Sequence, residues 1–286
     1  MNFIFRVDSS SQIGSGHIVR CLTLAKELNK RDNKCKFICR NHNNNLIKKI
    51  EKENFEVITL FNSNRLRTAK KNNTKHSNYY NWIGASWKED ANQTIDILKS
   101  EEADLLIIDH YEIDHKWEKK IRPYIKKIMV IDDLANRKHD CDLLLDQNLG
   151  SSKKRYKNLI PKYSKQLHGP LYALINSNYS LKRAKLKKRS AKIKRVLIYF
   201  GTGEETFKLL KTTLIAFSSQ DLLKMKLDIV FNGKFNDLKK LRRLITKRIK
   251  TQIYTNLPNL SSLMSKADLA IGAAGSTSWE RCCMGL

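Results

Sequence analysis

The chain has 286 residues, 41% of them hydrophobic, and a formal net charge of +27. That length suits two domains of ordinary size, each able to bury a core. No stretch approaches the roughly 20 apolar residues of a membrane span, and the N-terminus lacks the apolar region of a signal peptide. We therefore expect a cytoplasmic protein that does not insert into a membrane.

The positive charge by itself would indicate a nucleic-acid or anionic-membrane partner. However, the lysines are spread over the whole chain among many Asn and Ile residues, as AT-rich codons would produce, and no nucleic-acid motif accompanies them. We expect a monomer with no nucleic-acid partner. The six cysteines form no C-x-x-C pair and several lie in apolar segments, which is typical of reduced thiols acting as small hydrophobes.

Apolar runs alternate with amphipathic helical segments along the first half of the chain. The predicted strands are Phe3–Val7, Cys35–Cys39, Glu56–Leu60, Asp104–Asp109, Lys127–Ile131 and Leu143–Asp146, and the predicted helices are His17–Lys30, Asn45–Glu53, Glu89–Leu98 and Trp117–Tyr124. This alternation predicts parallel βαβ units in a doubly wound sheet. The polar segment Phe61–Tyr80 predicts a mobile loop.

A second series of elements begins at Arg195. It comprises strands at Val196–Phe200, Lys226–Phe231, Thr251–Tyr254 and Leu269–Gly272, and helices at Glu205–Phe217, Asp237–Thr246 and Asn259–Lys266. Nine of the fifteen residues from Leu181 to Arg195 are Lys or Arg, which favours a solvated linker or an exposed helix at the domain boundary. We expect an α/β protein with two Rossmann-like domains, 1–180 and 196–286, a basic linker at 181–195, and a ligand cleft between the domains. The second domain is expected to lack some ~40 to 60 residues of a typical domain.

The turn between the first strand and the first helix contains Gly14 and Gly16 and ends at His17. Glycines allow close approach of the backbone to a ligand, and a helix N-terminus offers free N–H groups to an anion. The turn therefore predicts a phosphate-bearing substrate beside an imidazole that can act as a general base. The alternative is that His17 only helps to start the helix. Asp8, at the other end of this loop, is a candidate to orient the ring.

Asp109 and Tyr111 follow an apolar strand at its carboxyl end, where open α/β sheets bind their ligands. The alternative is a strand-ending turn in which Asp109 is a cap. His110 and His115 lie nearby, but no further ligands fall at a supporting spacing, so we predict no metal.

A second strand–glycine turn–helix pattern contains Gly275, Ser276 and Thr277 and predicts another phosphate site. The alternative explanation of Thr277 and Glu280 is a capping box at the helix N-terminus. Gly201 and Gly203 follow the first strand of this domain and are candidates for a further phosphate contact.

The residues from Arg6 to Cys21 follow the pattern R-x-D-S-S-x-x-I-G-x-G-H-x-x-R-C, which resembles the opening of the PseG family, the UDP-sugar hydrolases of pseudaminic acid biosynthesis. Five further blocks match this family in order, at 107–111, 132–134, 141–148, 169–174 and 272–282. The segment Gly201–Glu205 resembles the S-F-G-G-S-D segment of the family, with Thr in place of Gly and Glu in place of Ser.

The resemblance implies a GT-B-like fold and hydrolysis of a UDP-2,4-diacetamido-2,4,6-trideoxyhexose without metal or cofactor. Water would displace UDP at the anomeric carbon with inversion, and His17 would take the proton. Tyr111 would touch the sugar, and Asp109 would hold the loop or substrate hydroxyls. Glu280 would bind the ribose, while the turn before it holds the diphosphate. Two alternatives stay open at this point: a GT-B glycosyltransferase using a UDP-sugar, and a basic nucleotide- or nucleic-acid-binding protein without catalysis.

Overall fold

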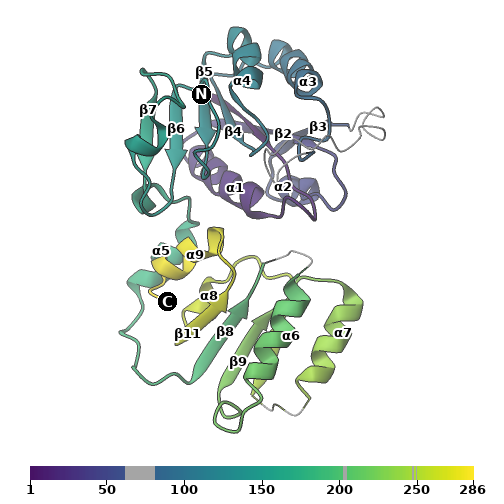
Figure 1. The fold of residues 1–286 in the computed structure, drawn as a ribbon, viewed down its shortest axis with the longest axis vertical. Coiled ribbons are helices and arrows are strands. Elements are labelled where there is room, and N and C mark those ends of the chain that lie inside the picture. The colour runs from purple at the N-terminus through teal and green to yellow at the C-terminus, as the bar shows by residue number, and fades with distance from the viewer. Residues whose placement is uncertain (62–80, 202–204, 247, 249) are drawn as a thin grey trace. The chain divides into compact units, whose positions relative to one another are not determined.

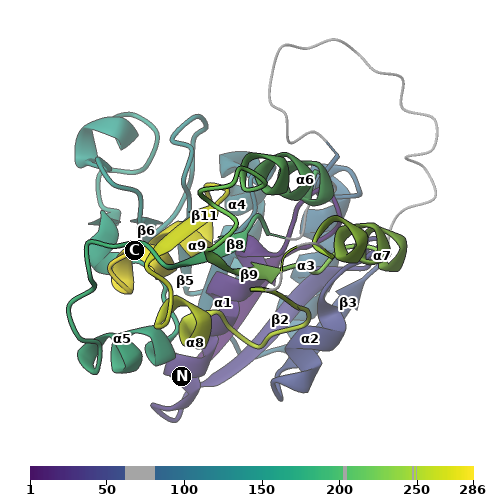
Figure 2. The same cartoon turned by 90° about the horizontal axis from the view of Figure 1, so that it is seen from below.

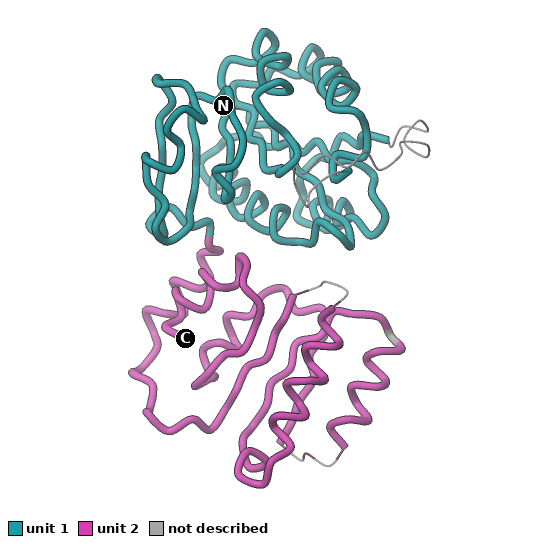
Figure 3. Tube along the Cα trace, in the orientation of Figure 1, with its two compact units in different colours: residues 1–174 teal, residues 175–286 magenta. Residues whose placement is uncertain are grey.

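The computed structural model describes the chain except residues 62–80, 202–204, 247 and 249. The loop predicted at Phe61–Tyr80 therefore lies outside the described residues except for Phe61, and so does the candidate Gly203. The chain divides into two compact units, Met1–Leu174 and Ile175–Leu286 (Figure 3). Each unit is described by itself below. Within the described residues, no helix is both long and apolar enough to cross a bilayer.

The first unit is built on a seven-stranded parallel sheet with the strand order β3-β2-β1-β4-β5-β6-β7 (Figure 1). The strands are β1 (Asn2–Val7), β2 (Lys34–Arg40), β3 (Glu56–Leu60), β4 (Leu105–Asp109), β5 (Lys127–Ile131), β6 (Leu143–Asp146) and β7 (Lys165–His168). The order runs outward in opposite directions from the pair β1–β4, which is therefore the topological switch point of the sheet. The parallel α/β class predicted from the sequence is confirmed.

Helices cover both faces of this sheet. They are α1 (Gly16–Asn29), α2 (Ile47–Lys52), α3 (Trp87–Ser100) and α4 (His115–Ile121), with short 3-10 turns at Arg122–Tyr124, Lys153–Tyr156 and Pro170–Tyr172. Successive strand residues face opposite sides, so Phe5 packs with Ile18 of α1, while Ile4 belongs to the cluster of Ile95 of α3 and Trp117 of α4. Figure 1 accordingly shows α1 and α2 on one face and α3 and α4 on the other.

The second unit repeats this plan on a smaller scale, with a four-stranded parallel sheet in the order β10-β9-β8-β11. Its strands are β8 (Arg195–Tyr199), β9 (Lys226–Val230), β10 (Thr251–Tyr254) and β11 (Leu269–Gly272), and its helices are α5 (Ser177–Ala184), α6 (Thr206–Ala216), α7 (Phe235–Leu244), α8 (Ser261–Met264) and α9 (Ser276–Cys283). The helices α6 and α7 lie side by side over one face (Figures 1 and 2). The switch point of this sheet lies between β8 and β11.

The basic segment 181–195, predicted as a solvated linker or an exposed helix at the domain boundary, lies inside the second unit, which begins at Ile175. Its first residues complete α5, and the third residue of this helix is the buried Tyr179, whose hydroxyl accepts a hydrogen bond from Leu260 N at 3.1 Å. Arg189 donates to the carbonyl oxygens of Met264 (2.9 Å) and Met284 (2.6 Å), at the ends of α8 and α9. A guanidinium has five donors and suits the unpaired carbonyls of a helix C-terminus. Much of the segment is therefore part of the second unit.

Candidate active site

The loop that joins β1 to α1 is a compact turn closed by its own backbone. Gly14 N donates to Ser10 O at 2.9 Å, and the Ser10 hydroxyl accepts from Ile13 N at 3.0 Å. Gly14 has φ +82°, in the left-handed region that side chains other than glycine rarely adopt. Gly16 is the first residue of α1, and within the part of the chain that the structure describes its N-cap residue makes no side-chain capping hydrogen bond. The first-turn N–H groups of α1 thus lack intrahelical partners, as an anion site at a helix N-terminus requires.

His17 lies at the switch point between β1 and β4. Its Nδ1 is 2.6 Å from Oδ1 of Asp109, the last residue of β4, and the residue is only 7% exposed. Parallel pairing aligns Val7 at the end of β1 with Asp109, which brings the turn and the carboxylate together. A carboxylate can only accept, so Nδ1 carries the hydrogen and Nε2 of the neutral ring carries a lone pair.

Asp109 is fixed as a carboxylate by Arg20, one turn after His17 on α1. Arg20 donates from Nε to Oδ2 at 2.5 Å and from Nη2 to Oδ1 at 2.6 Å. Burial by itself would raise the pKa of Asp109, but the Arg20 guanidinium and His17 outweigh it and hold this pKa well below its usual value. Asp109 therefore contacts His17 and Arg20, and is not the strand-ending cap that the sequence analysis gave as the alternative.

Tyr111 lies edge-on to the His17 ring, with centroids 4.6 Å apart and planes at 83°. Its hydroxyl donates to Asp133 Oδ2 at 2.7 Å, and Arg20 Nη1 donates to the same oxygen. Burial and the Asp133 charge raise the pKa of Tyr111, so it stays a neutral phenol. Trp82 stacks on Tyr111 at 5.7 Å and also meets His17 edge-on. Two aromatic rings therefore border the imidazole.

Asp8 does not orient His17, contrary to the sequence prediction. It is fully buried and lies 2.7 Å from Arg6 Nη1, and it accepts from Arg40 N at 2.7 Å. Burial would raise the pKa of Asp8, but Arg6, with His110 and His42 beside it, holds it well below its usual value. The reason for the difference is strand order: Asp8 faces the end of β2, whereas β4 supplies the partner of His17.

At the second switch point, Gly275 is the N-cap of α9 and Ser276 and Thr277 are its first residues. The alternative explanation of Thr277 and Glu280 as a capping box does not hold, because Gly275 is the N-cap and its N donates to Ser278 Oγ at 3.3 Å. Glu280 lies against Tyr179 instead: burial, the Glu280 charge and a hydrogen bond to Glu280 raise the pKa of that tyrosine.

The backbones of β11 and β8 approach closely beside this turn. A Cβ on Gly272 would lie 2.4 Å from Tyr199 O, so that position requires glycine. Gly201, two residues beyond β8, has φ +89°. The second sheet thus has two positions that favour glycine, Gly272 and Gly201, at its switch point.

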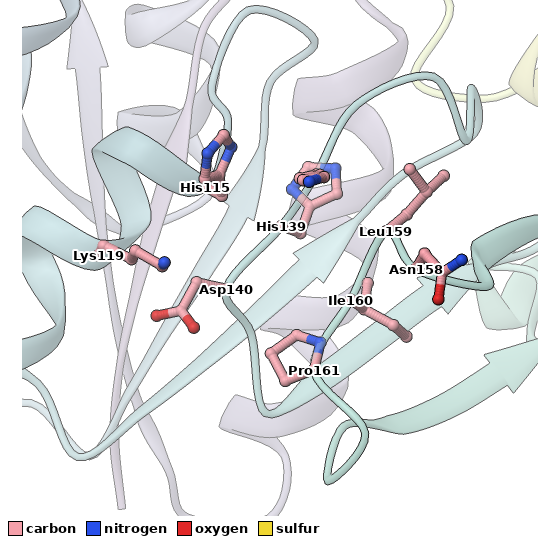
Figure 4. A pocket seen from close by; sticks show the side chains of 9 residues that line it. His115, Lys119, His139, Asp140, Asn158, Leu159, Ile160 and Pro161 are labelled. Atoms are coloured by element: carbon pink, nitrogen blue, oxygen red, sulfur yellow. The ribbon is translucent and has the colours of Figure 1, made fainter.

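A separate cavity of about 210 Å³ lies beside α4 and is lined by His115, Lys119, Lys138, His139, Asp140 and residues 158–161 (Figure 4). His139 Nδ1 lies 2.7 Å from Glu118, and Arg122 Nε donates to Asp140 at 3.1 Å. Among the described residues, His115 Nδ1 and His139 Nε2 are buried and have no hydrogen-bond partner. No predicted site residue lines it. Within the described residues, no group of three His, Cys, Asp or Glu side chains is arranged to hold a metal.

Sequence reasoning did not single out Arg20, Asp133 or Trp82. Arg20 lies three residues after His17 on a helix, and that spacing places the two on the same face. A buried arginine there indicates an acidic partner. Asp133 and Trp82 come from distant segments, and no local pattern links them to His17.

The two sheets, each with a switch point bordered by a glycine turn, define a GT-B-like α/β protein, as the sequence analysis predicted. The solved structure of a UDP-glucosyltransferase from Polygonum tinctorium superposes with a TM-score of 0.63 at 10% identity, covering 100% of this chain and 78% of that one. No protein-family model matches the chain.

Among curated proteins, the chain is 28% identical over 278 residues to the UDP-2,4-diacetamido-2,4,6-trideoxy-beta-L-altropyranose hydrolase of Campylobacter jejuni, covering 96% of this chain and 86% of that protein. It is also 28% identical over 296 residues to an uncharacterized protein of Methanocaldococcus jannaschii. That match covers 100% of this chain but 54% of the relative, so the chain spans about half the length of this archaeal protein.

Proposed function

We propose that the chain is a UDP-sugar hydrolase that releases UDP from a UDP-2,4-diacetamido-2,4,6-trideoxyhexose, with His17 as the general base. The observation that carries this proposal is the 2.6 Å contact between His17 Nδ1 and Asp109, which leaves Nε2 as the basic nitrogen beside the N-terminus of α1. The similarity to the Campylobacter hydrolase extends over 96% of the chain and supports the same assignment.

In this mechanism, Nε2 of His17 accepts a proton from a water molecule while the water oxygen bonds to the anomeric carbon. The bond from that carbon to the diphosphate oxygen breaks, and UDP leaves with the bonding electron pair. The new imidazolium lies against the Asp109 carboxylate, which stabilises its charge. Tyr111, beside the ring, is the candidate contact to the sugar.

The second unit would hold the nucleotide under this proposal. The N-terminus of α9, with Gly275, Ser276 and Thr277, would take the diphosphate, and Gly201 and Gly203 are candidates to approach it from the neighbouring turn. Glu280 would accept hydrogen bonds from the ribose hydroxyls, held in place by its contact with Tyr179.

The test is release of UDP from a panel of UDP-diacetamido-trideoxyhexoses with no acceptor present, followed by NMR. His17→Ala should lower turnover by about 10²–10⁴, the usual contribution of a positioned base, while UDP still binds. His115→Ala is the matched control, because His115 lies at the start of α4 and not against Asp109. Retention of more than a tenth of wild-type turnover by His17→Ala would contradict the assignment of His17.

A GT-B glycosyltransferase is the second candidate, favoured by the likeness of the fold to the Polygonum enzyme. A transferase needs an acceptor and releases UDP only slowly without one. UDP release that depends on an added acceptor would therefore replace the hydrolase assignment.

A further inference from the structure

Arg20 lies between two carboxylates, and the charges of this cluster do not balance. It donates to both oxygens of Asp109 and to Oδ2 of Asp133. One cation and two anions leave a formal charge of −1 within this cluster, in which Arg20 is 5% and Asp109 1% exposed and the side chain of Asp133 is 16% exposed. Within the described residues, Asp133 Oδ1 is buried and has no hydrogen-bond partner. An uncompensated buried charge is costly, so the cluster favours the arrival of one positive charge.

The groups around His17 are Asp109 on β4, Arg20 and Cys21 on α1, Tyr111 after β4 and Asp133 after β5. Three of them are held in one ionisation state: Asp109 as the anion, and Tyr111 and Cys21 as neutral groups. Burial and the Asp109 charge raise the pKa of the Cys21 thiol, and burial and Asp133 raise the pKa of Tyr111.

We propose that Arg20 and Asp133 are positioning residues with separate roles in proton uptake by His17. Arg20 keeps Asp109 ionised and fixed on Nδ1, so that Nε2 stays the basic nitrogen. Asp133 supplies the negative charge that compensates the imidazolium once Nε2 has taken a proton. The catalytic consequence rests on the proposed function, whereas the charge arrangement does not.

The test is a ¹⁵N NMR titration of the histidine rings in the full chain, with the His17 signal assigned by its loss in His17→Gln. In Asp133→Asn, the midpoint of the His17 titration should fall by about one pH unit, the usual effect of a neighbouring charge, while the hydrogen stays on Nδ1. In Arg20→Met, the midpoint should rise because a cation has been removed. Asp96→Asn removes an exposed carboxylate of α3 and is the matched control.

Opposite shifts in these two variants cannot arise from a general loss of folding. If Arg20→Met does not fold, Tyr111→Phe replaces it: loss of the phenol donor leaves Asp133 less neutralised and should also raise the midpoint. Shifts in the same direction, or shifts no larger than that of Asp96→Asn, would overturn the inference.

Kinetics separate this inference from the proposed function. If His17 is the base, the kcat of Asp133→Asn falls, its KM changes little, and the acid limb of its pH profile moves with the NMR midpoint. Midpoints that move as expected in a chain that releases no UDP would support the charge arrangement and refute the hydrolase proposal.

Discussion

Asp109→Asn is the sharpest test of the arrangement around His17. Both oxygens of Asp109 can only accept hydrogen bonds. Oδ1 accepts from His17 Nδ1 and from Arg20 Nη2, each at 2.6 Å, and Oδ2 accepts from Arg20 Nε at 2.5 Å. An asparagine keeps one acceptor, and its NH₂ group faces Arg20 Nε in one orientation and both His17 Nδ1 and Arg20 Nη2 in the other. Arg20 cannot give up a proton, so the least costly relief moves the imidazole hydrogen to Nε2, and Nδ1 then accepts from the amide.

The size of the effect follows from this tautomer change. With its hydrogen on Nε2, the ring presents no base to the water, and turnover should fall by about 10²–10⁴, equivalent to about 3–5 kcal/mol in the activation barrier. Folding should suffer less, because Arg20 keeps Asp133 as a partner. We expect a loss of about 1–3 kcal/mol in the free energy of unfolding, below the roughly 3–5 kcal/mol of a buried charge left alone.

The assay is UDP release measured beside urea unfolding of the same preparation, with Asp96→Asn as the control for loss of one carboxylate. The NMR signature of the ring gives an independent readout, since the hydrogen should appear on Nε2. A folded Asp109→Asn that keeps more than a third of wild-type turnover would refute the reasoning.

Three further predictions concern the nucleotide, pH and salt. Glu280→Gln should weaken UDP binding in calorimetry by about 1.5–3 kcal/mol, the usual contribution of a charged hydrogen bond, with little effect on the chemical step; unchanged affinity would contradict the ribose role. Neighbouring cations lower the pKa of Asp8, Asp90 and Asp109 in the folded state below that of a free aspartate. The unfolded chain therefore binds protons first as the pH falls. The contribution of these carboxylates to the free energy of unfolding is complete above about pH 5 and declines below about pH 4, by up to about 1.4 kcal/mol per pH unit for each group. Urea unfolding at pH 3, 4 and 6 should show this slope, and a free energy of unfolding that does not change with pH would contradict it. Binding of RNA by the protein should weaken between about 0.05 and about 0.2 M salt while UDP binding persists, because scattered lysines act through counterion release. Filter binding of RNA, run beside a UDP titration, tests this. Salt-resistant, sequence-selective RNA binding would overturn the enzyme assignment.

Most of the sheet could be predicted because its strands are apolar runs buried on both faces. The strands Glu56–Leu60 and Lys127–Ile131 have the predicted bounds. By contrast, β7 reads Lys165-Gln-Leu-His168 and has no fully buried residue, so no apolar run marks it. The helix α5 was hidden for a related reason, since its basic residues suggested a solvated segment while Tyr179 anchors it in the second unit.

The glycine turn of the site could be predicted because it is local, but the partner of His17 could not. Asp8 is nine residues from His17 and Asp109 is ninety-two, yet pairing of β1 with β4 makes Asp109 the neighbour. Sequence spacing contains no information on which strand lies beside which. The adjacent Asp132 and Asp133 illustrate the same limit: Asp132 accepts a hydrogen bond from Arg137, whereas Asp133 accepts one from Arg20.

The distribution of imidazoles restricts how the two units can share the chemistry. Both sheets have the order third, second, first, fourth strand around a switch point with glycine positions, so both offer a place for an anion. All seven histidines of the chain, however, lie between His17 and His168, in the first unit. At the second switch point, Glu280 lies against Tyr179, whose pKa it raises. Under the hydrolase proposal, a histidine base would therefore come from the first unit, and the second unit would contribute to binding.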